Sequence, residues 1–154
     1  MSSAPEAATG GGGSLRLIGR FLRFGLVGGS GVFVDMGALY LLHDPKRLAL
    51  PLVTAKLISA QLAIINNFAW NETWTFADRA ALHPGARERW IRFARFELIC
   101  LTGVAITVAV LSFCVRRLEL HYLLANAIAI GVGTAWNFLV NLRWNWTAPR
   151  ENHA

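Results

Sequence analysis

Apolar residues in this chain fall into four long blocks separated by short polar segments. The blocks cover about residues 21–42, 51–70, 95–115 and 122–140. A helix needs roughly 20 apolar residues to cross a bilayer core, so each block is long enough to span a membrane. The pattern predicts an all-α membrane protein with four transmembrane helices within residues 15–147. A Gly-rich disordered tail at 1–14 and a short tail at 148–154 are expected to flank them.

Composition supports a membrane protein and argues against a soluble enzyme. Hydrophobic residues make up 55% of the 154 residues and charged residues 16%, and the mean hydropathy is +0.43. Soluble domains carry about a quarter charged residues. The sequence has no nucleophile–histidine–acid set, metal-ligand spacing or phosphate-cradling loop. We therefore expect neither catalysis nor a bound metal or cofactor.

Basic residues flank the apolar blocks and indicate the orientation. The net charge is +6 and the pI is near 10.4. Because no nucleic-acid motif is present, we expect these charges to meet anionic lipid headgroups and not nucleic acid. Lysine and arginine prefer the cytoplasmic side. With both termini cytoplasmic, that side holds Arg16, Arg20, Arg23, Arg79, Arg87, Arg89, Arg92, Arg95, Arg143 and Arg150. This bias predicts a multi-pass protein of the cytoplasmic membrane.

Tryptophans gather at the same predicted interface. They are Trp70, Trp74, Trp90, Trp144 and Trp146. Amphipathic rings favour the headgroup level of a bilayer, so we expect these residues to form an aromatic belt on the cytoplasmic side.

The chain contains an internal repeat. The segment Arg20-Phe21-Leu22-Arg23-Phe24 recurs 72 positions later as Arg92-Phe93-Ala94-Arg95-Phe96, and Gly31 recurs as Gly103. The pattern Asn67-Phe68-x-x-Asn71-x-x-Trp74 recurs 70 positions later as Asn137-Phe138-x-x-Asn141-x-x-Trp144. Each half is thus a helical hairpin that returns to its starting side. The halves should share one orientation, related by an axis along the membrane normal, with a hydrophilic site at their seam.

These two repeated motifs resemble those of the GtrA-like family. The resemblance covers about residues 18–147. Members are small membrane proteins of cell-surface polysaccharide synthesis, implicated in moving polyprenyl-phosphate-linked sugars across the cytoplasmic membrane. The resemblance implies translocation of a polyprenyl-phosphate-linked monosaccharide. Related four-helix domains are attached to polyprenyl-phosphate glycosyltransferases, which makes such an enzyme an implied partner.

Repeated polar residues near the cytoplasmic ends are candidates for contact with a lipid phosphate. Arginine forks bind phosphate in a bidentate manner, and the Asn–Asn–Trp spacing places those side chains on one helical face. The candidates are Arg20, Arg23, Asn67, Asn71, Trp74, Arg92, Arg95, Asn137, Asn141 and Trp144. A structural role stays open for each: arginine can anchor a helix at the interface, and asparagine can hydrogen-bond between helices.

Asp35 and Lys56 lie inside apolar blocks, where charges are costly and often functional. Asp35 is about 12 Å of helix from the loop that follows it, and Lys56 is about 7.5 Å from the same loop. They are therefore predicted to pair. The matching positions in the second half are the uncharged Thr107 and Asn126. A polar path for a sugar headgroup and a purely structural ion pair both remain open.

Small residues in the first helix predict close helix packing. Gly25 and Gly29 form a small-xxx-small pair, a spacing at which helix backbones approach one another in membranes.

Three function classes remain open. The first is translocation of the lipid-linked sugar, and the second is a membrane anchor or scaffold for a glycosyltransferase. The third is a small proton-coupled exporter built around Asp35, against which the neighbouring Lys56 argues by repelling a cation. Because four helices are too few to shield a sugar headgroup, we also expect a homodimer.

Overall fold

The computed structural model describes residues 10–147. Its helices are α1 (Gly10–His43), α2 (Leu52–Trp70), α3 (Ala77–Ala80), α4 (Ala86–Arg117) and α5 (Tyr122–Val140). Two π-helical turns, η1 (Asn71–Thr75) and η2 (Asn141–Asn145), directly extend α2 and α5. The described residues contain no strand, and the predicted all-α fold is confirmed.

Four helical segments are long and apolar enough to cross a membrane. They are Gly13–His43, Leu52–Thr75, Ala86–Arg117 and Leu124–Asn145. This confirms a multi-pass membrane protein. The helices are longer than the apolar blocks because hydropathy marks only the part in hydrocarbon: α1 begins at Gly10, inside the segment assigned to a tail, and α4 begins at Ala86 rather than Arg95. The predicted tails at 1–9 and 148–154 lie outside the described residues.

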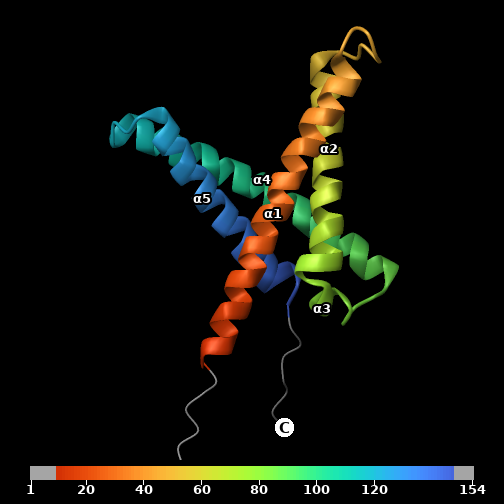
Figure 1. The fold of residues 1–154 in the computed structure, drawn as a ribbon, viewed down its shortest axis with the longest axis vertical. Coiled ribbons are helices and arrows are strands. Elements are labelled where there is room, and N and C mark those ends of the chain that lie inside the picture. The colour runs from red at the N-terminus through yellow and green to blue at the C-terminus, as the bar shows by residue number, and fades with distance from the viewer. Residues whose placement is uncertain (1–9, 148–154) are drawn as a thin grey trace, which may run out of the picture.

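The helices form two hairpins, α1 with α2 and α4 with α5. Figure 1 shows that the hairpins meet near α3 and diverge toward their connecting loops. We call the end where they meet the basic end, because it holds Arg16, Arg20, Arg23, Arg79, Arg89, Arg92, Arg95 and Arg143. The opposite end, which holds the connections 44–51 and 118–121, is the loop end.

Within each hairpin a glycine of the first helix lies against an asparagine of the second helix. A Cβ atom on Gly31 would lie 2.4 Å from Oδ1 of Asn67, and one on Gly103 would lie 2.2 Å from Oδ1 of Asn137. A side chain at either position would require the asparagine side chain to move. Thus Asn67 and Asn137 pack inside their own hairpins.

Gly25 and Gly29 do not bring helices together within the chain. A Cβ on either would meet no atom of the described residues within 4 Å. The predicted packing at this pair is therefore wrong for the single chain, because the two glycines lie on the exposed side of α1.

Stacked aromatic rings join the two halves at the basic end. Phe76 and Trp146, both buried, stack with centroids 4.5 Å apart and planes within 9°. The other ring contacts between halves come in matched pairs: Phe24–Phe138 at 5.7 Å with Phe68–Phe96 at 5.8 Å, and Phe21–Phe138 with Phe68–Phe93, both at 5.2 Å. The matching places a pseudo-twofold axis between Phe76 and Trp146 and confirms the repeat.

This aromatic seam corrects two expectations. The centre of the contact between halves at the basic end is a stack of rings and not an open hydrophilic site, and the polar groups around the stack, such as Glu72 and Arg92, are buried. Trp146 does not belong to an interfacial belt, because only 1% of it is exposed, whereas Trp70, Trp74, Trp90 and Trp144 are exposed. The reason is that Trp146 occupies the position that Phe76 has in the first half.

Enlarging Gly31 should destabilise the first hairpin. We expect Gly31→Val to lower the free energy of unfolding by about 1–3 kcal/mol, the usual cost of overpacking. Thermal unfolding in detergent measures this. Gly29→Val adds the same side chain two positions away in open space and should change little. Equal destabilisation by both would contradict the close contact with Asn67.

Candidate functional site: a basic pocket in the first half

The two π-helical turns determine which side chains face outward. Each turn closes with a 2.8 Å hydrogen bond, from the backbone N–H of Phe76 to the Asn71 carbonyl and from that of Trp146 to the Asn141 carbonyl. A π-helical turn holds one more residue than an α-helical turn. Asn71 therefore lies buried at the seam, while Trp74 is 42% exposed. The predicted common face of Asn67, Asn71 and Trp74 is not formed.

Each half places an arginine over the exposed tryptophan of its π-helical turn. The guanidinium of Arg23 lies 5.5 Å from the Trp74 ring centroid, and that of Arg95 lies 5.4 Å from Trp144. Such cation–π contacts hold an arginine in place without consuming its hydrogen-bond donors. Arg95 also donates to the carbonyl of Trp144 at 3.4 Å.

A basic pocket of about 560 Å³ lies between the start of α1 and η1. Its lining is Leu15, Arg16, Gly19, Arg20, Arg23, Trp74, Thr75, Ala77 and Asp78. The three arginines share one face of α1, because they are four and three residues apart. Arg20 donates to Asp78, a carboxylate that is itself 60% exposed. With three cations and one anion, the pocket carries net positive charge.

Two further groups shape the basic pocket. The hydroxyl of Thr75 is buried and has no hydrogen-bond partner within residues 10–147. Behind the pocket, Arg79 donates to the carbonyls of Leu142 at 2.9 Å and Trp146 at 2.6 Å. Burial, and then the nearby charge of Arg20, lower the pKa of Arg79 from its ordinary value. Arg79 nevertheless stays charged at any physiological pH.

An apolar pocket of about 510 Å³ adjoins the basic pocket. It is lined by Leu26, Val27, Ser30, Trp70, Thr73 and Trp74. Trp74 forms a wall of both pockets. Moving along α1 from the basic end, the surface thus changes from arginines to apolar side chains. This order suits an amphiphile with an anionic head and an apolar chain.

The equivalent arginine pocket of the second half is closed. Arg92, the counterpart of Arg20, donates through Nε at 3.0 Å and through Nη2 to the buried Glu72 carboxylate. Its Nη1 donates to the carbonyl of His83 at 3.0 Å, and Nε1 of Trp146 donates to Glu72 at 2.9 Å. Arg92 is 6% exposed, so its guanidinium is not available to a ligand.

Glu72 makes the two halves chemically different, and the sequence analysis did not single it out. Its counterpart in the second half is Leu142, so only the first half supplies a carboxylate to the seam. The available clue was this break in an otherwise repeated motif. Asn145 was also missed: it donates to the Arg92 carbonyl at 3.0 Å and to Oδ1 of Asn141 at 3.1 Å.

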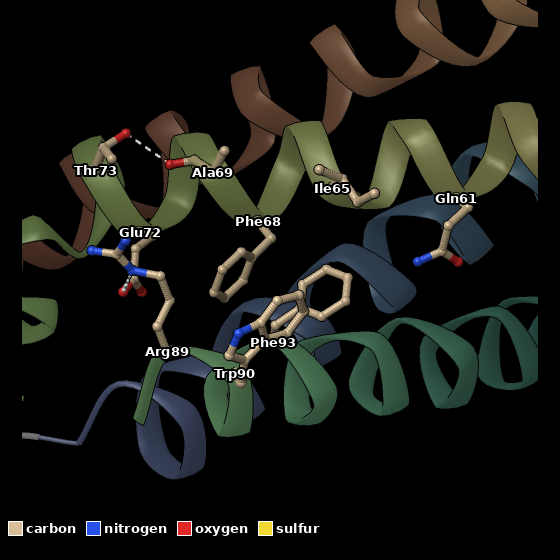
Figure 2. A pocket seen from close by; sticks show the side chains of 9 residues that line it. All are labelled: Gln61, Ile65, Phe68, Ala69, Glu72, Thr73, Arg89, Trp90 and Phe93. Carbon is tan, nitrogen blue, oxygen red and sulfur yellow. Dashed lines mark hydrogen bonds and ion pairs between the residues drawn. The ribbon is translucent and has the colours of Figure 1, made fainter. Parts of the chain in front are cut away.

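A third cavity, of about 370 Å³, lies beside Glu72 between α2 and α4. Figure 2 shows the rings of Phe68, Trp90 and Phe93 gathered along it, with Glu72 and Arg89 together at one end. Arg89 lies 3.6 Å from Glu72 and is largely exposed. Because Arg92 already neutralises Glu72, the exposed Arg89 leaves this end positive. The rest of the cavity is apolar.

The predicted pair of Asp35 and Lys56 is confirmed. The Lys56 ammonium donates to Asp35, and the Ser59 hydroxyl donates to the other carboxylate oxygen at 2.7 Å. Asp35 lies about 18 Å along α1 from Arg23, so the pair is outside the basic pocket.

The structure therefore groups only some of the predicted site residues. Arg20, Arg23 and Trp74 line one open pocket. Asn67 and Asn71 are packed in the first half, and Asp35 and Lys56 pair apart from the pocket. The remaining candidates, Arg92, Arg95, Asn137, Asn141 and Trp144, belong to the second half, where Arg92 and Asn141 are buried and Arg95 lies over the exposed Trp144. There, Nδ2 of Asn141 donates to the Asn137 carbonyl at 2.8 Å.

Comparison with known proteins agrees with this architecture. The family described as GtrA/DPMS, transmembrane domain, matches residues 23–146. A dolichol-phosphate mannosyltransferase of Pyrococcus furiosus is 31% identical over 129 residues, which are 84% of this chain and 34% of that relative. The chain thus spans about a third of the length of this relative. Because the family match covers all four membrane-spanning helices, the chain belongs to the GtrA/DPMS transmembrane domain family.

Proposed function

We propose that the chain binds the phosphate of a polyprenyl-phosphate-linked monosaccharide in the basic pocket and moves this lipid across the cytoplasmic membrane for cell-surface polysaccharide synthesis. The observation that carries the proposal is the open basic pocket adjoining an apolar one. The name of the mannosyltransferase relative contains dolichol phosphate, a polyprenyl phosphate, which supports the same ligand class.

Each part of the ligand has a matching surface. Arg20 and Arg23 hold the phosphate, with Arg16 at the rim of the pocket. Arginine–phosphate hydrogen bonds are charge-assisted and therefore strong. The first isoprene units lie in the apolar pocket against Trp70 and Trp74.

The basic end faces the cytoplasm in this proposal, as the positive-inside rule favours. A lipid phosphate in the inner leaflet then meets the pocket at headgroup level. The excess of arginine at this end attracts anionic lipid headgroups, and a polyprenyl phosphate is one of them.

The translocation step starts on the surface of the first hairpin that faces away from the second hairpin. The rings of Phe76, Trp146 and their neighbours fill the contact between halves at the basic end. A headgroup leaving the basic pocket therefore passes along α1 and η1, beside Ser30 and Thr73, whose hydroxyls donate to the carbonyls of Val27 and Ala69 and keep oxygen lone pairs as acceptors. Direction is supplied by consumption of the lipid on the far side or by an ion gradient.

A second candidate function is that of a membrane anchor for a polyprenyl-phosphate glycosyltransferase. The observation in its favour is that the relative is named a mannosyltransferase and that this chain spans only about a third of it. In this alternative the basic pocket presents the lipid phosphate to the transferase, and no sugar crosses the membrane. Both candidates assign the chemistry of sugar transfer to another polypeptide region.

Removing the pocket arginines should weaken binding of a prenyl phosphate. We expect Arg20→Gln with Arg23→Gln to lower the affinity for farnesyl phosphate at least about tenfold, because each lost hydrogen bond to a charged group is worth about 1.5–3 kcal/mol. Titration of the detergent-solubilised protein measures this. Arg116→Gln with Arg117→Gln removes two arginines at the loop end and should leave the affinity unchanged. Farnesol, which lacks the phosphate, should bind all three proteins equally. Equal binding of farnesyl phosphate to all three would contradict the assignment.

Reconstitution separates the two candidate functions. In vesicles, the protein should speed exposure of a polyprenyl-phosphate sugar to an outside reagent that modifies the sugar. The Arg20→Gln, Arg23→Gln variant should lose most of this acceleration, while the loop-end variant keeps it. If the unmodified protein binds farnesyl phosphate but accelerates nothing, the anchor function is favoured and translocation is wrong.

A further inference from the structure

The ion pair of Asp35 and Lys56 is accessible from outside the chain although it lies within the membrane-spanning part. The Asp35 side chain is 22% exposed and that of Lys56 is 51% exposed. Among residues 10–147 the pair has one further partner, Ser59, which comes from the same hairpin. Within the described part of the chain, no side chain of the second hairpin hydrogen-bonds to the pair.

Helix geometry shows which way this pair faces. Asp35 follows Phe24 by about three helical turns and so lies on the same face of α1. Phe24 contacts Phe138 of the second half at the basic end. Asp35 therefore lies on the face of α1 that contacts the second half at the basic end, but at a level where the two hairpins have diverged (Figure 1).

Leaving an ion pair against lipid is unfavourable. Charged side chains within a bilayer almost always face protein or a water-filled cavity. The pockets described above are not lined by Asp35 or Lys56. The remaining capacity for hydrogen bonds is considerable, since an ammonium has three donors and Lys56 uses one on Asp35.

We propose that the Asp35–Lys56 pair is the contact point between two copies of the chain, which associate through their first hairpins. A pair of opposite charges is complementary to itself under twofold rotation: Lys56 of each copy meets Asp35 of the other. Four alternating charges then satisfy one another. Exposed apolar residues beside the pair, Val32, Met36 and Val53, pack around it.

The internal repeat explains why the contact uses the first hairpin. The second half has Thr107 and Asn126 at the matching positions, and Thr107 donates to the Gly103 carbonyl within its own helix at 2.9 Å. It offers no pair of opposite charges. The association does not depend on the basic pocket, which lies on another part of the hairpin.

Exchange of the charges tests the proposal. The protein, labelled with a single fluorophore and diluted in lipid vesicles, should show two-step photobleaching at lipid ratios where independent molecules would be separate. Asp35→Thr with Lys56→Asn installs the second half's residues and should lower the association constant at least tenfold. Asp35→Lys with Lys56→Asp keeps a self-complementary pair and should retain association within about threefold.

A crosslinking experiment does not require any change of charge. In a chain with Cys100→Ser and Cys114→Ala, Val32→Cys should be joined between copies by a short bismaleimide, since Val32 lies one turn from Asp35. Val104→Cys is the matched control, because Val104 holds the same position in the second half and is similarly exposed. It should not be joined.

Two results would overturn the proposal. One is a wild-type protein that bleaches in single steps and gives no crosslink at Val32→Cys. The other is a Asp35→Thr, Lys56→Asn variant that is folded and still dimeric but slows exposure of the sugar lipid. That outcome would assign the pair to a headgroup path instead.

Discussion

The stack of Phe76 on Trp146 is the contact on which the architecture depends. Helices in lipid gain little from hydrophobic burial against one another, so their association relies on packing and interhelical hydrogen bonds. Large rings supply extensive contact with defined geometry. Because each ring directly follows a π-helical turn, the extra residue of the turn carries it to the pseudo-twofold axis. The same turn moves Trp74 and Trp144 outward, where an arginine covers each. The aromatic contact between the halves and the arginine–tryptophan contacts beside it thus both depend on the π-helical turn at the end of each hairpin.

A single substitution between the halves makes the two sides unequal. Glu72 in the first half corresponds to Leu142 in the second, and its carboxylate engages Arg92 and Trp146 across the seam. Removing one partner from a buried ion pair commonly costs about 3–5 kcal/mol, so Arg92 is held as part of the framework. Arg20 meets only the exposed Asp78 and stays within reach of a ligand. A duplicated hairpin thereby becomes one structural half and one half with an open pocket.

Much of this organisation could be predicted from the sequence, and the remainder has identifiable physical reasons. The four spans follow from the length of the apolar blocks, and the pairing of Asp35 with Lys56 follows from their similar depth on adjacent helices. The π-helical turns could not be predicted, because no residue type specifies them. As a result, the sequence did not show that the second asparagine of the Asn–Asn–Trp motif would be buried and its tryptophan exposed. Trp146 was misplaced for that reason. The closure of Arg92 by Glu72 depends on tertiary contacts that helical periodicity does not show.

The unequal halves can be observed directly with tryptophan as the reporter. Trp74 and Trp144 occupy equivalent positions, but Trp74 lines the basic pocket, whereas the second half's counterpart of Arg20, Arg92, is buried against Glu72. Fluorine NMR of the protein labelled with 5-fluorotryptophan, assigned with Trp74→Phe and Trp144→Phe, follows both during titration with farnesyl phosphate. The account predicts a saturable shift of the Trp74 resonance and an unchanged Trp144 resonance. Equal shifts of both, or a shift of Trp144 alone, would contradict it.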